Sequence, residues 1–107
     1  MAPATKLPAW EKTSAEVQIF AAEQGVANYI PAILNMTRQI FSNSTMQVAV
    51  EDDPEIADDR HIILEVSVRN MDVSQALQAE YRWHEGLFAH CPAPLASVFR
   101  LGLDITR

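Results

Sequence analysis

The sequence has little of what small specialised proteins often depend on. Its 107 residues include one cysteine, Cys91, so no intramolecular disulfide can form. This excludes the secreted scaffolds that are held together by disulfides, and it suits a reducing compartment. No apolar run approaches the roughly 18 residues of a membrane span, and the first residues lack the apolar core of a signal peptide. We therefore predict a cytoplasmic protein with no membrane partner.

Basic charge is scarce as well. The chain has 8 Lys and Arg against 14 Asp and Glu, which gives a net charge of −6. A chain without a basic surplus lacks the electrostatic footprint that drives binding to nucleic acid or to an anionic membrane. The sequence therefore predicts no nucleic-acid partner.

Glycine is the third scarce residue. Gly25, Gly86 and Gly102 are the only three, and they lie far apart. A glycine-rich loop that would cradle a phosphate is therefore missing. No other motif that dictates a cofactor is found, so none is predicted.

What the chain does contain is typical of one ordinary globular domain. The apolar share is 49% and the charged share is 21%, both near average values. A domain of this length can bury about two-thirds of the surface that its unfolded form exposes. Residues 1–12 carry two prolines and little pattern, so we predict a flexible N-terminal arm there and a single domain over 13–107.

Helical spacing of apolar residues predicts two helices in the first half. Val17, Phe20 and Ala21 form the stripe of the first helix, which Gly25 ends because glycine readily adopts a left-handed conformation. The second helix is expected over 28–41, with Pro31 in its first turn, where a missing backbone N–H is harmless.

A third helix is expected to follow Asp72. This residue and Gln75, three positions later, have the spacing of a capping box, and the prolines after Cys91 end the helix. Its main apolar stripe is predicted to consist of Val73, Leu77, Tyr81, His84 and Phe88, widened by Ala76, Ala79, Trp83 and Leu87.

Strict alternation of apolar and polar residues predicts strands over 45–51, 61–69 and 98–105. The fold class is therefore α+β in the order α-α-β-β-α-β, with a small, mainly antiparallel three-stranded sheet and the helices on one face. We place the third strand beside the first. Such a sheet has two exposed edges, and the sequence therefore leaves homodimerisation open.

Acidic residues are concentrated in the loop between the first two strands. The six acids that fall within nine residues are Glu51, Asp52, Asp53, Glu55, Asp58 and Asp59. The other eight acids of the chain match its eight Lys and Arg in number. The loop contains Pro54 and no glycine, unlike a calcium-binding hand. Its negative field could attract a basic partner surface and speed association, while the plainer interpretation is a solvated loop.

A second set of polar residues is the alternative site. A small charged ligand could bind between the sheet and the third helix through five side chains: His61, Glu65, Arg69, His84 and Arg100. On the open face of the sheet, Glu65 and Arg69 could instead form cross-strand ion pairs with Asp104 and Arg100.

Three further candidates are weighed and set aside. The cluster that contains Glu80, His84, Glu85, His90 and Cys91 lacks the paired spacing of a zinc site, so no metal site is predicted. Cys91 as a nucleophile would sit at a helix C-terminus, where the dipole disfavours a thiolate. Residues 21–26 have the spacing of a helix-turn-helix turn, but the following helix carries Arg38 as its only cation.

These observations favour a protein-interaction module that acts through self-association or through a basic protein partner. No catalytic residue is predicted, because no set of catalytic groups is assembled. A small enzyme or ligand-binding subunit, using the alternative site, is the second hypothesis.

Overall fold

The computed structural model describes residues 14–42 and 44–106. The predicted arm at 1–12 lies outside the described residues. The elements are α1 (Ala15–Glu23), the 3-10 helix η2 (Ala27–Tyr29), α2 (Ile30–Ile40), β1 (Thr45–Asp52), β2 (Arg60–Arg69), α3 (Val73–His90), α4 (Ala93–Ala96) and β3 (Phe99–Thr106). The predicted element order is confirmed, with the short helices η2 and α4 in addition.

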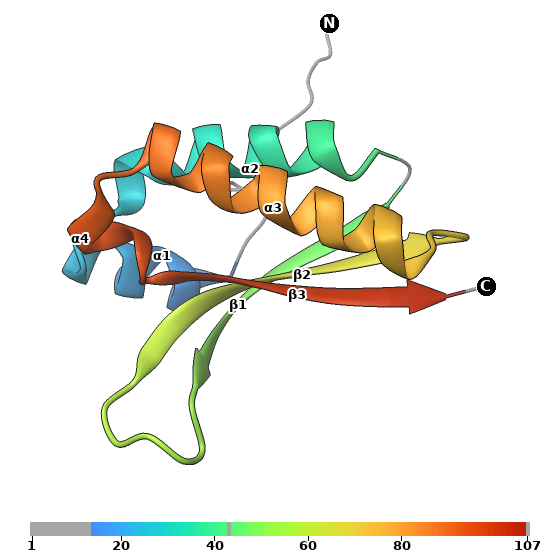
Figure 1. The fold of residues 1–107 in the computed structure, drawn as a ribbon. Coiled ribbons are helices and arrows are strands. Elements are labelled where there is room, and N and C mark those ends of the chain that lie inside the picture. Colours follow the sequence, from blue (N-terminus) through green and yellow to red (C-terminus); the bar gives the residue numbers. More distant parts are fainter. Residues whose placement is uncertain (1–13, 43, 107) are drawn as a thin grey trace, which may run out of the picture.

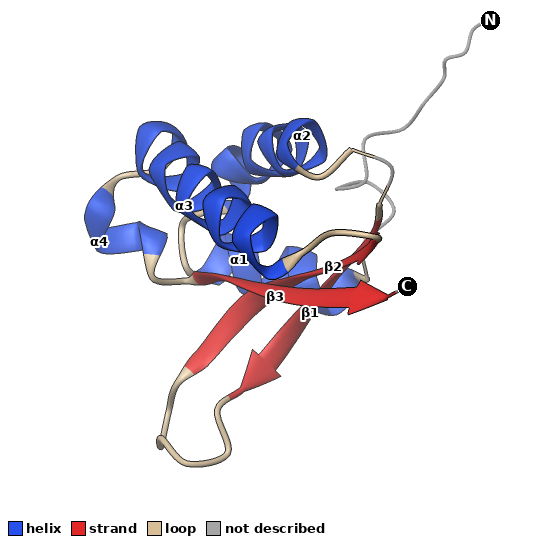
Figure 2. Ribbon diagram, turned by 45° about the vertical axis from the view of Figure 1, so that its right-hand side comes forward, coloured by secondary structure: helices blue, strands red, loops and turns tan. Residues whose placement is uncertain are grey.

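The molecule has a helical layer on one face of a three-stranded sheet. Helices α2 and α3 lie side by side on this face, as two views of the ribbon show (Figures 1 and 2). Helix α1 lies beside β1, near the end where the β1–β2 hairpin leaves the body. The predicted α+β class, with helices packed on one face, is confirmed.

The sheet is mixed, and its strand order differs from the prediction. The order is β1-β2-β3; β1 runs antiparallel to β2, and β3 runs parallel to β2. The placement of the third strand beside the first is therefore wrong, and β3 runs parallel to its neighbour where the sequence predicts an antiparallel strand. Strand β2 is the most buried strand. Its helix-facing residues are at most 3% exposed: Ile62, Leu64, Val66 and Val68. A central position, with a neighbour on each side, buries such a strand best.

Local signals at the helix ends act as the sequence predicts. The Gln75 backbone N–H donates to Asp72 Oδ1 at 2.8 Å, and the Asp72 N–H donates to Gln75 Oε1 at 3.0 Å, which completes the capping box of α3. Gly25 has φ of 72° after α1, and Pro31 lies in the first turn of α2. Helix α3 ends at His90, before Pro92.

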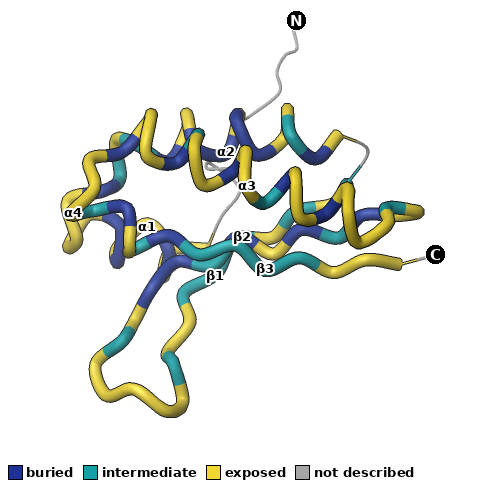
Figure 3. The backbone as a smooth tube through the Cα atoms, viewed as in Figure 1, coloured by how far each residue is buried: buried dark blue, intermediate teal, exposed yellow. Residues whose placement is uncertain are grey.

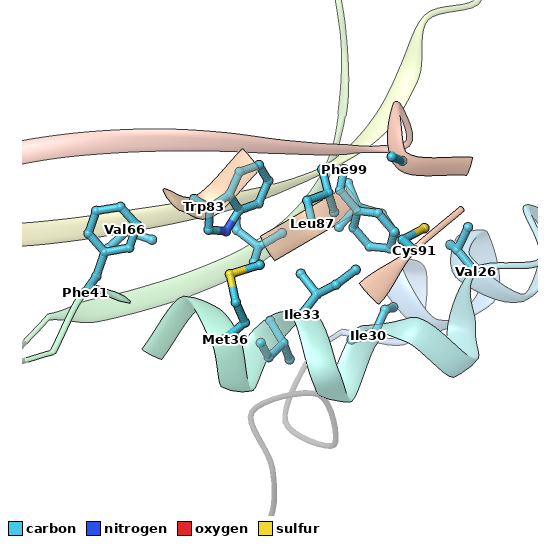
Figure 4. Close-up of a cluster of buried hydrophobic side chains, with 14 of the residues drawn as sticks. Val26, Ile30, Ile33, Met36, Phe41, Val66, Trp83, Leu87, Cys91 and Phe99 are labelled. Atoms are coloured by element: carbon cyan, nitrogen blue, oxygen red, sulfur yellow. The ribbon is translucent and has the colours of Figure 1, made fainter. Parts of the chain in front are cut away.

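The core fills the space between the helices and the sheet. Figure 4 shows Trp83 and Leu87 of α3 among apolar side chains of α2, with Phe99 of β3 nearby. The indole N–H of Trp83 donates to Thr37 Oγ1 at 2.8 Å, and both side chains are buried. This contact joins α3 to α2 in the middle of the core.

The buried face of α3 differs from the predicted one. The buried face consists of the four residues that were expected only to widen the main stripe: Ala76, Ala79, Trp83 and Leu87. The predicted main stripe faces outward instead, with exposed fractions of 72% for Val73, 59% for Leu77, 77% for Tyr81 and 58% for Phe88. The reason is that the two stripes are adjacent on the helix, and only packing against α2 selects one of them.

Candidate functional site

The acidic loop lies at the tip of the β1–β2 hairpin, which projects away from the helical layer (Figure 1). Most of the tip is exposed, as the tube in Figure 3 shows. The backbone N–H of Asp53 donates to the Asp59 carbonyl at 3.0 Å, and Asp53 Oδ1 accepts the N–H of Glu55 at 2.8 Å. Asp58 has φ of 61°, a left-handed conformation that aspartate tolerates better than most residues. The loop is therefore held in a defined shape by hydrogen bonds between its own residues.

Three of the six acids are paired with basic side chains. Glu51 Oε1 lies 3.0 Å from His61 Nε2, Asp52 Oδ1 lies 3.3 Å from Arg60 Nε, and Asp59 Oδ1 lies 3.0 Å from an Arg100 guanidinium nitrogen. The Asp59–Arg100 pair is less exposed than the Asp52–Arg60 pair, and it joins the loop to β3. All three pairs fix the base of the hairpin, and the two Arg–Asp pairs neutralise part of its charge.

Arg60 also connects the hairpin to α1. Its guanidinium nitrogen lies 3.3 Å from Glu16 Oε2, and its guanidinium carbon lies 5.8 Å from the centre of the Phe20 ring. A cation over an aromatic face is weakly attracted to it even at the surface. The hairpin is therefore held against α1 as well as against β3.

The other three acids have no cationic partner within residues 14–42 and 44–106. They are Asp53, Glu55 and Asp58, all in the loop itself. Their negative charge faces solvent at the point of the molecule that is farthest from the helical layer (Figure 1). The predicted acidic surface thus has a paired base and an unpaired tip.

The structure does not gather the five residues of the alternative site. Strand alternation and register put His61, Glu65 and Arg69 of β2, with Arg100 of β3, on the sheet face that points away from α2 and α3. His84 lies on the exposed part of α3, where its ring makes an edge contact with Trp83. The space between the sheet and α3 is filled by apolar side chains such as Leu64 and Leu87. A polar ligand site between these two layers is therefore not formed.

The open sheet face carries a polar hollow away from the acidic loop. Its lining residues are Thr45, Met46, Gln47, Glu65, Ser67 and Asp104. No ion pair joins Glu65, Arg69 or Asp104 to a described residue, and Arg100 pairs with Asp59 rather than with Glu65 or Asp104. The predicted cross-strand ion pairs are therefore not formed.

His61 is the one buried polar side chain on this face of β2, with 4% of its surface exposed. Its Nε2 faces Glu51, whereas no described residue is within hydrogen-bonding distance of its Nδ1. The neutral form with the proton on Nε2 suits this arrangement, because it leaves only an acceptor unpaired.

The Cys91 cluster has no metal-binding geometry. Within the described part of the chain, no group of three or more His, Cys, Asp or Glu side chains could hold a metal ion. Cys91 is 2% exposed and packs in the core near Phe99 (Figure 4). Burial raises the pKa of its thiol, since the thiolate would lose its hydration. The side chain therefore serves packing.

We expect the Cys91 thiol to be protected from a thiol reagent in the native state. At pH 8, labelling with a chromogenic disulfide should be at least about 100-fold slower in buffer than in concentrated urea, because reaction requires local opening. Labelling at the same rate in both conditions would contradict the burial of this thiol. A Cys91→Ala variant provides the blank.

The sequence revealed the main apolar stripe of α3 but not that this stripe is exposed. It consists of Val73, Leu77, Tyr81 and Phe88, and a shallow apolar hollow lies between Leu77, Tyr81 and their neighbours Glu80 and His84. The signal was present, because Trp83 and Leu87 with two alanines form a second helical stripe. A helix with two apolar stripes can bury one stripe in the core of its domain and leave the other exposed for contact with another molecule.

No helix among the described residues is both long enough and apolar enough to cross a membrane. Comparison of the chain with protein-family models, with curated protein sequences and with solved structures gave no match.

Proposed function

We propose that the chain is a non-enzymatic, cytoplasmic protein-interaction module whose acidic loop docks onto a basic surface of a partner protein. The observation that carries this proposal is the unpaired charge of Asp53, Glu55 and Asp58 at the tip of a projecting hairpin. A tip that stands clear of the body can approach a concave or flat surface without a clash from the helices.

The paired acids support the same function in a different way. Asp59 with Arg100 and Asp52 with Arg60 anchor both sides of the loop. A loop that already has its bound shape loses less conformational entropy when it binds. The paired residues therefore act as positioning residues, and the unpaired ones would make the contact.

Electrostatics indicates the chemistry of the partner. Unpaired carboxylates in water attract a cationic surface over about 10 Å at 0.1 M ionic strength, which raises association rates more than final affinity. Nucleic acid and anionic lipid would be repelled by the same charges. A protein with a Lys- or Arg-rich patch is the partner class that fits.

The test compares two charge-matched double variants in a pull-down from the native host. Glu55→Gln/Asp58→Asn removes two unpaired loop charges, and Glu23→Gln/Glu85→Gln removes two exposed charges from α1 and α3. We expect a stoichiometric partner to be retained by the wild type and by the helix variant. The loop variant should bind it at least about 10-fold more weakly, with most of the difference in the association rate.

Salt dependence provides the second readout. Association with the wild type should slow as ionic strength rises, and association with the loop variant should respond less. A partner that the loop variant retains as well as the helix variant does would remove the acidic loop from the proposal.

A further inference from the structure

The exposed stripe of α3 occupies a defined flank of that helix. Gly86 faces α2, because an added Cβ there would come within 2.9 Å of the Met36 side chain. Trp83 and Leu87 face the core and the sheet. At 100° per residue, Leu77 and Tyr81 then lie on the flank of α3 that is opposite to α2.

This flank lies on the β3 side of the sheet. Helix α2 is near β1, since Thr37, Phe41 and Met46 line one hollow. Helix α3 connects β2 to β3 and lies beside α2 on the same face (Figures 1 and 2). The helix-facing residues of β3 are correspondingly less covered than those of β2: Leu101 and Leu103 are half-buried, and Ile105 is 38% exposed.

Strand β3 also presents an open backbone edge. The Ile62 N–H donates to the Val98 carbonyl at 2.7 Å, and the Asn70 N–H donates to the Thr106 carbonyl at 2.9 Å. In a parallel ladder these two hydrogen bonds mean that the backbone N–H and C=O groups of the even-numbered residues of β3 point toward β2. The N–H and C=O groups of the odd-numbered residues therefore point outward, and no described strand pairs with them: Phe99, Leu101, Leu103 and Ile105.

The two edges of the sheet are not equivalent. Helix α1 lies beside β1, at the other edge. The β3 edge instead combines unpaired backbone groups with the exposed apolar flank of α3. An open edge next to an apolar surface is the arrangement that pairs with another chain.

We propose that a second copy of this chain occupies this surface, with the two β3 strands paired antiparallel across a two-fold axis. The result is a continuous six-stranded sheet that carries both α3 helices on the same face. The proposal goes beyond the acidic loop, which lies at the distal end of the hairpin and takes no part in it.

The register of the pairing follows from self-complementarity. An axis through Gly102 sets Leu101 opposite Leu103 of the second copy and Phe99 opposite Ile105, so that all outward backbone groups are paired. On the open face the same register sets Arg100 opposite Asp104, which has no cationic partner among the described residues. Opposite charges on directly facing strand positions stabilise a sheet.

Helix spacing agrees with this arrangement. Strands in a sheet lie about 4.8 Å apart, and a helix that connects two parallel strands packs above the gap between them. The two α3 axes then come within about 10 Å of each other, the usual distance for packed helices. The stripe is self-complementary as well, since Val73 lies eight residues before Tyr81 and Phe88 lies seven after it.

The surface is large enough for a stable contact. The exposed parts of Val73, Leu77, Tyr81, Phe88 and Ile105 amount to on the order of 500 Å² of apolar surface. A standard interface buries about 800 Å² on each partner, and the edge of β3 supplies backbone area in addition.

The first experiment measures the mass of the full chain by sedimentation equilibrium. We expect the wild type to be a dimer at about 100 µM. Leu77→Glu should raise the dissociation constant at least about 100-fold, because it places a charge in the apolar stripe that the interface buries. Gln78→Glu, which adds the same charge one residue away on another flank, should remain dimeric. Circular dichroism checks that both variants are folded.

The second experiment tests the register. Gly102→Cys should form an intermolecular disulfide under a mild oxidant, because the two Gly102 residues face each other at the axis. Thr106→Cys, four residues from the axis, should not. The pairing of β3 fails if Gly102→Cys does not cross-link beyond Thr106→Cys.

The remaining outcomes are also decisive. A monomeric wild type, or a Leu77→Glu variant that dimerises like Gln78→Glu, would overturn the proposal. The Glu55→Gln/Asp58→Asn variant should dimerise normally, so that failure of the acidic-loop function and failure of the dimer are told apart.

Discussion

Replacement of Trp83 by alanine is expected to lower the free energy of unfolding by about 3–5 kcal/mol. The side chain is fully buried and is the largest in the core. Its removal leaves a cavity between α2, α3 and the sheet that the surrounding helices and strands can only partly fill. Chemical denaturation followed by circular dichroism measures the change. The expected loss is a large part of the total stability of a domain, which is about 5–15 kcal/mol.

The contribution of the Trp83 hydrogen bond to stability can be measured separately from the contribution of burying its ring. Trp83 donates to Thr37 Oγ1, which in turn donates to the Ile33 carbonyl at 2.7 Å. Thr37→Val leaves the buried indole N–H without an acceptor, at a cost of about 1–3 kcal/mol. Trp83→Phe combined with Thr37→Val should cost less than the sum of the two single changes, because the double variant leaves no unpaired donor.

Tyr81→Ala is the matched control for Trp83→Ala. It removes an aromatic ring from the same helix, but from a position that is 77% exposed. Its effect on a monomer should stay within about 0.5 kcal/mol. An equal loss for Tyr81→Ala and Trp83→Ala would mean that α3 is rotated from the position described.

Two leucines of α3 are expected to respond to the same substitution very differently. Leu87→Ala should cost about 2–5 kcal/mol, because Leu87 is 3% exposed. Leu77→Ala should cost less than about 0.5 kcal/mol in the monomer, since Leu77 is 59% exposed. Thermal unfolding of both variants compares the same Leu→Ala substitution at a buried and at an exposed position of one helix.

Protein concentration separates folding from association in this comparison. If Leu77 lies in a dimer interface, Leu77→Ala lowers the apparent stability at high concentration, and the effect disappears on dilution. The effect of Leu87→Ala should persist at every concentration. A larger loss for Leu77→Ala than for Leu87→Ala in dilute solution would refute the observed orientation of α3.

The candidate site was predictable only in part. The sequence placed the six acids together at one hairpin, because they are close in the chain, although Glu51 and Asp52 belong to β1 rather than to the loop. It did not show that Asp59 is paired with Arg100, 41 residues away, or that Asp53, Glu55 and Asp58 are the members without a cationic partner. The prediction of the alternative site was wrong for the same reason. No local pattern in the sequence shows that His84 and the four sheet residues lie on opposite sides of the apolar core.

The sequence by itself determined the elements of this protein. The capping pair Asp72 and Gln75, the stop at Gly25 and the alternation along 61–69 each act over a few residues, where backbone geometry alone decides the outcome. These signals were enough for the α+β class and for the element order.

Only the tertiary structure decided which surfaces are buried and which are left open. Both stripes of α3 satisfy the helical period, and the contact between Trp83 and Thr37, 46 residues apart, selects one. Likewise, the strand order depends on burying β2 between two neighbours. The physical reason is common to both: periodicity is a property of one element, whereas burial is a property of the elements that pack against it.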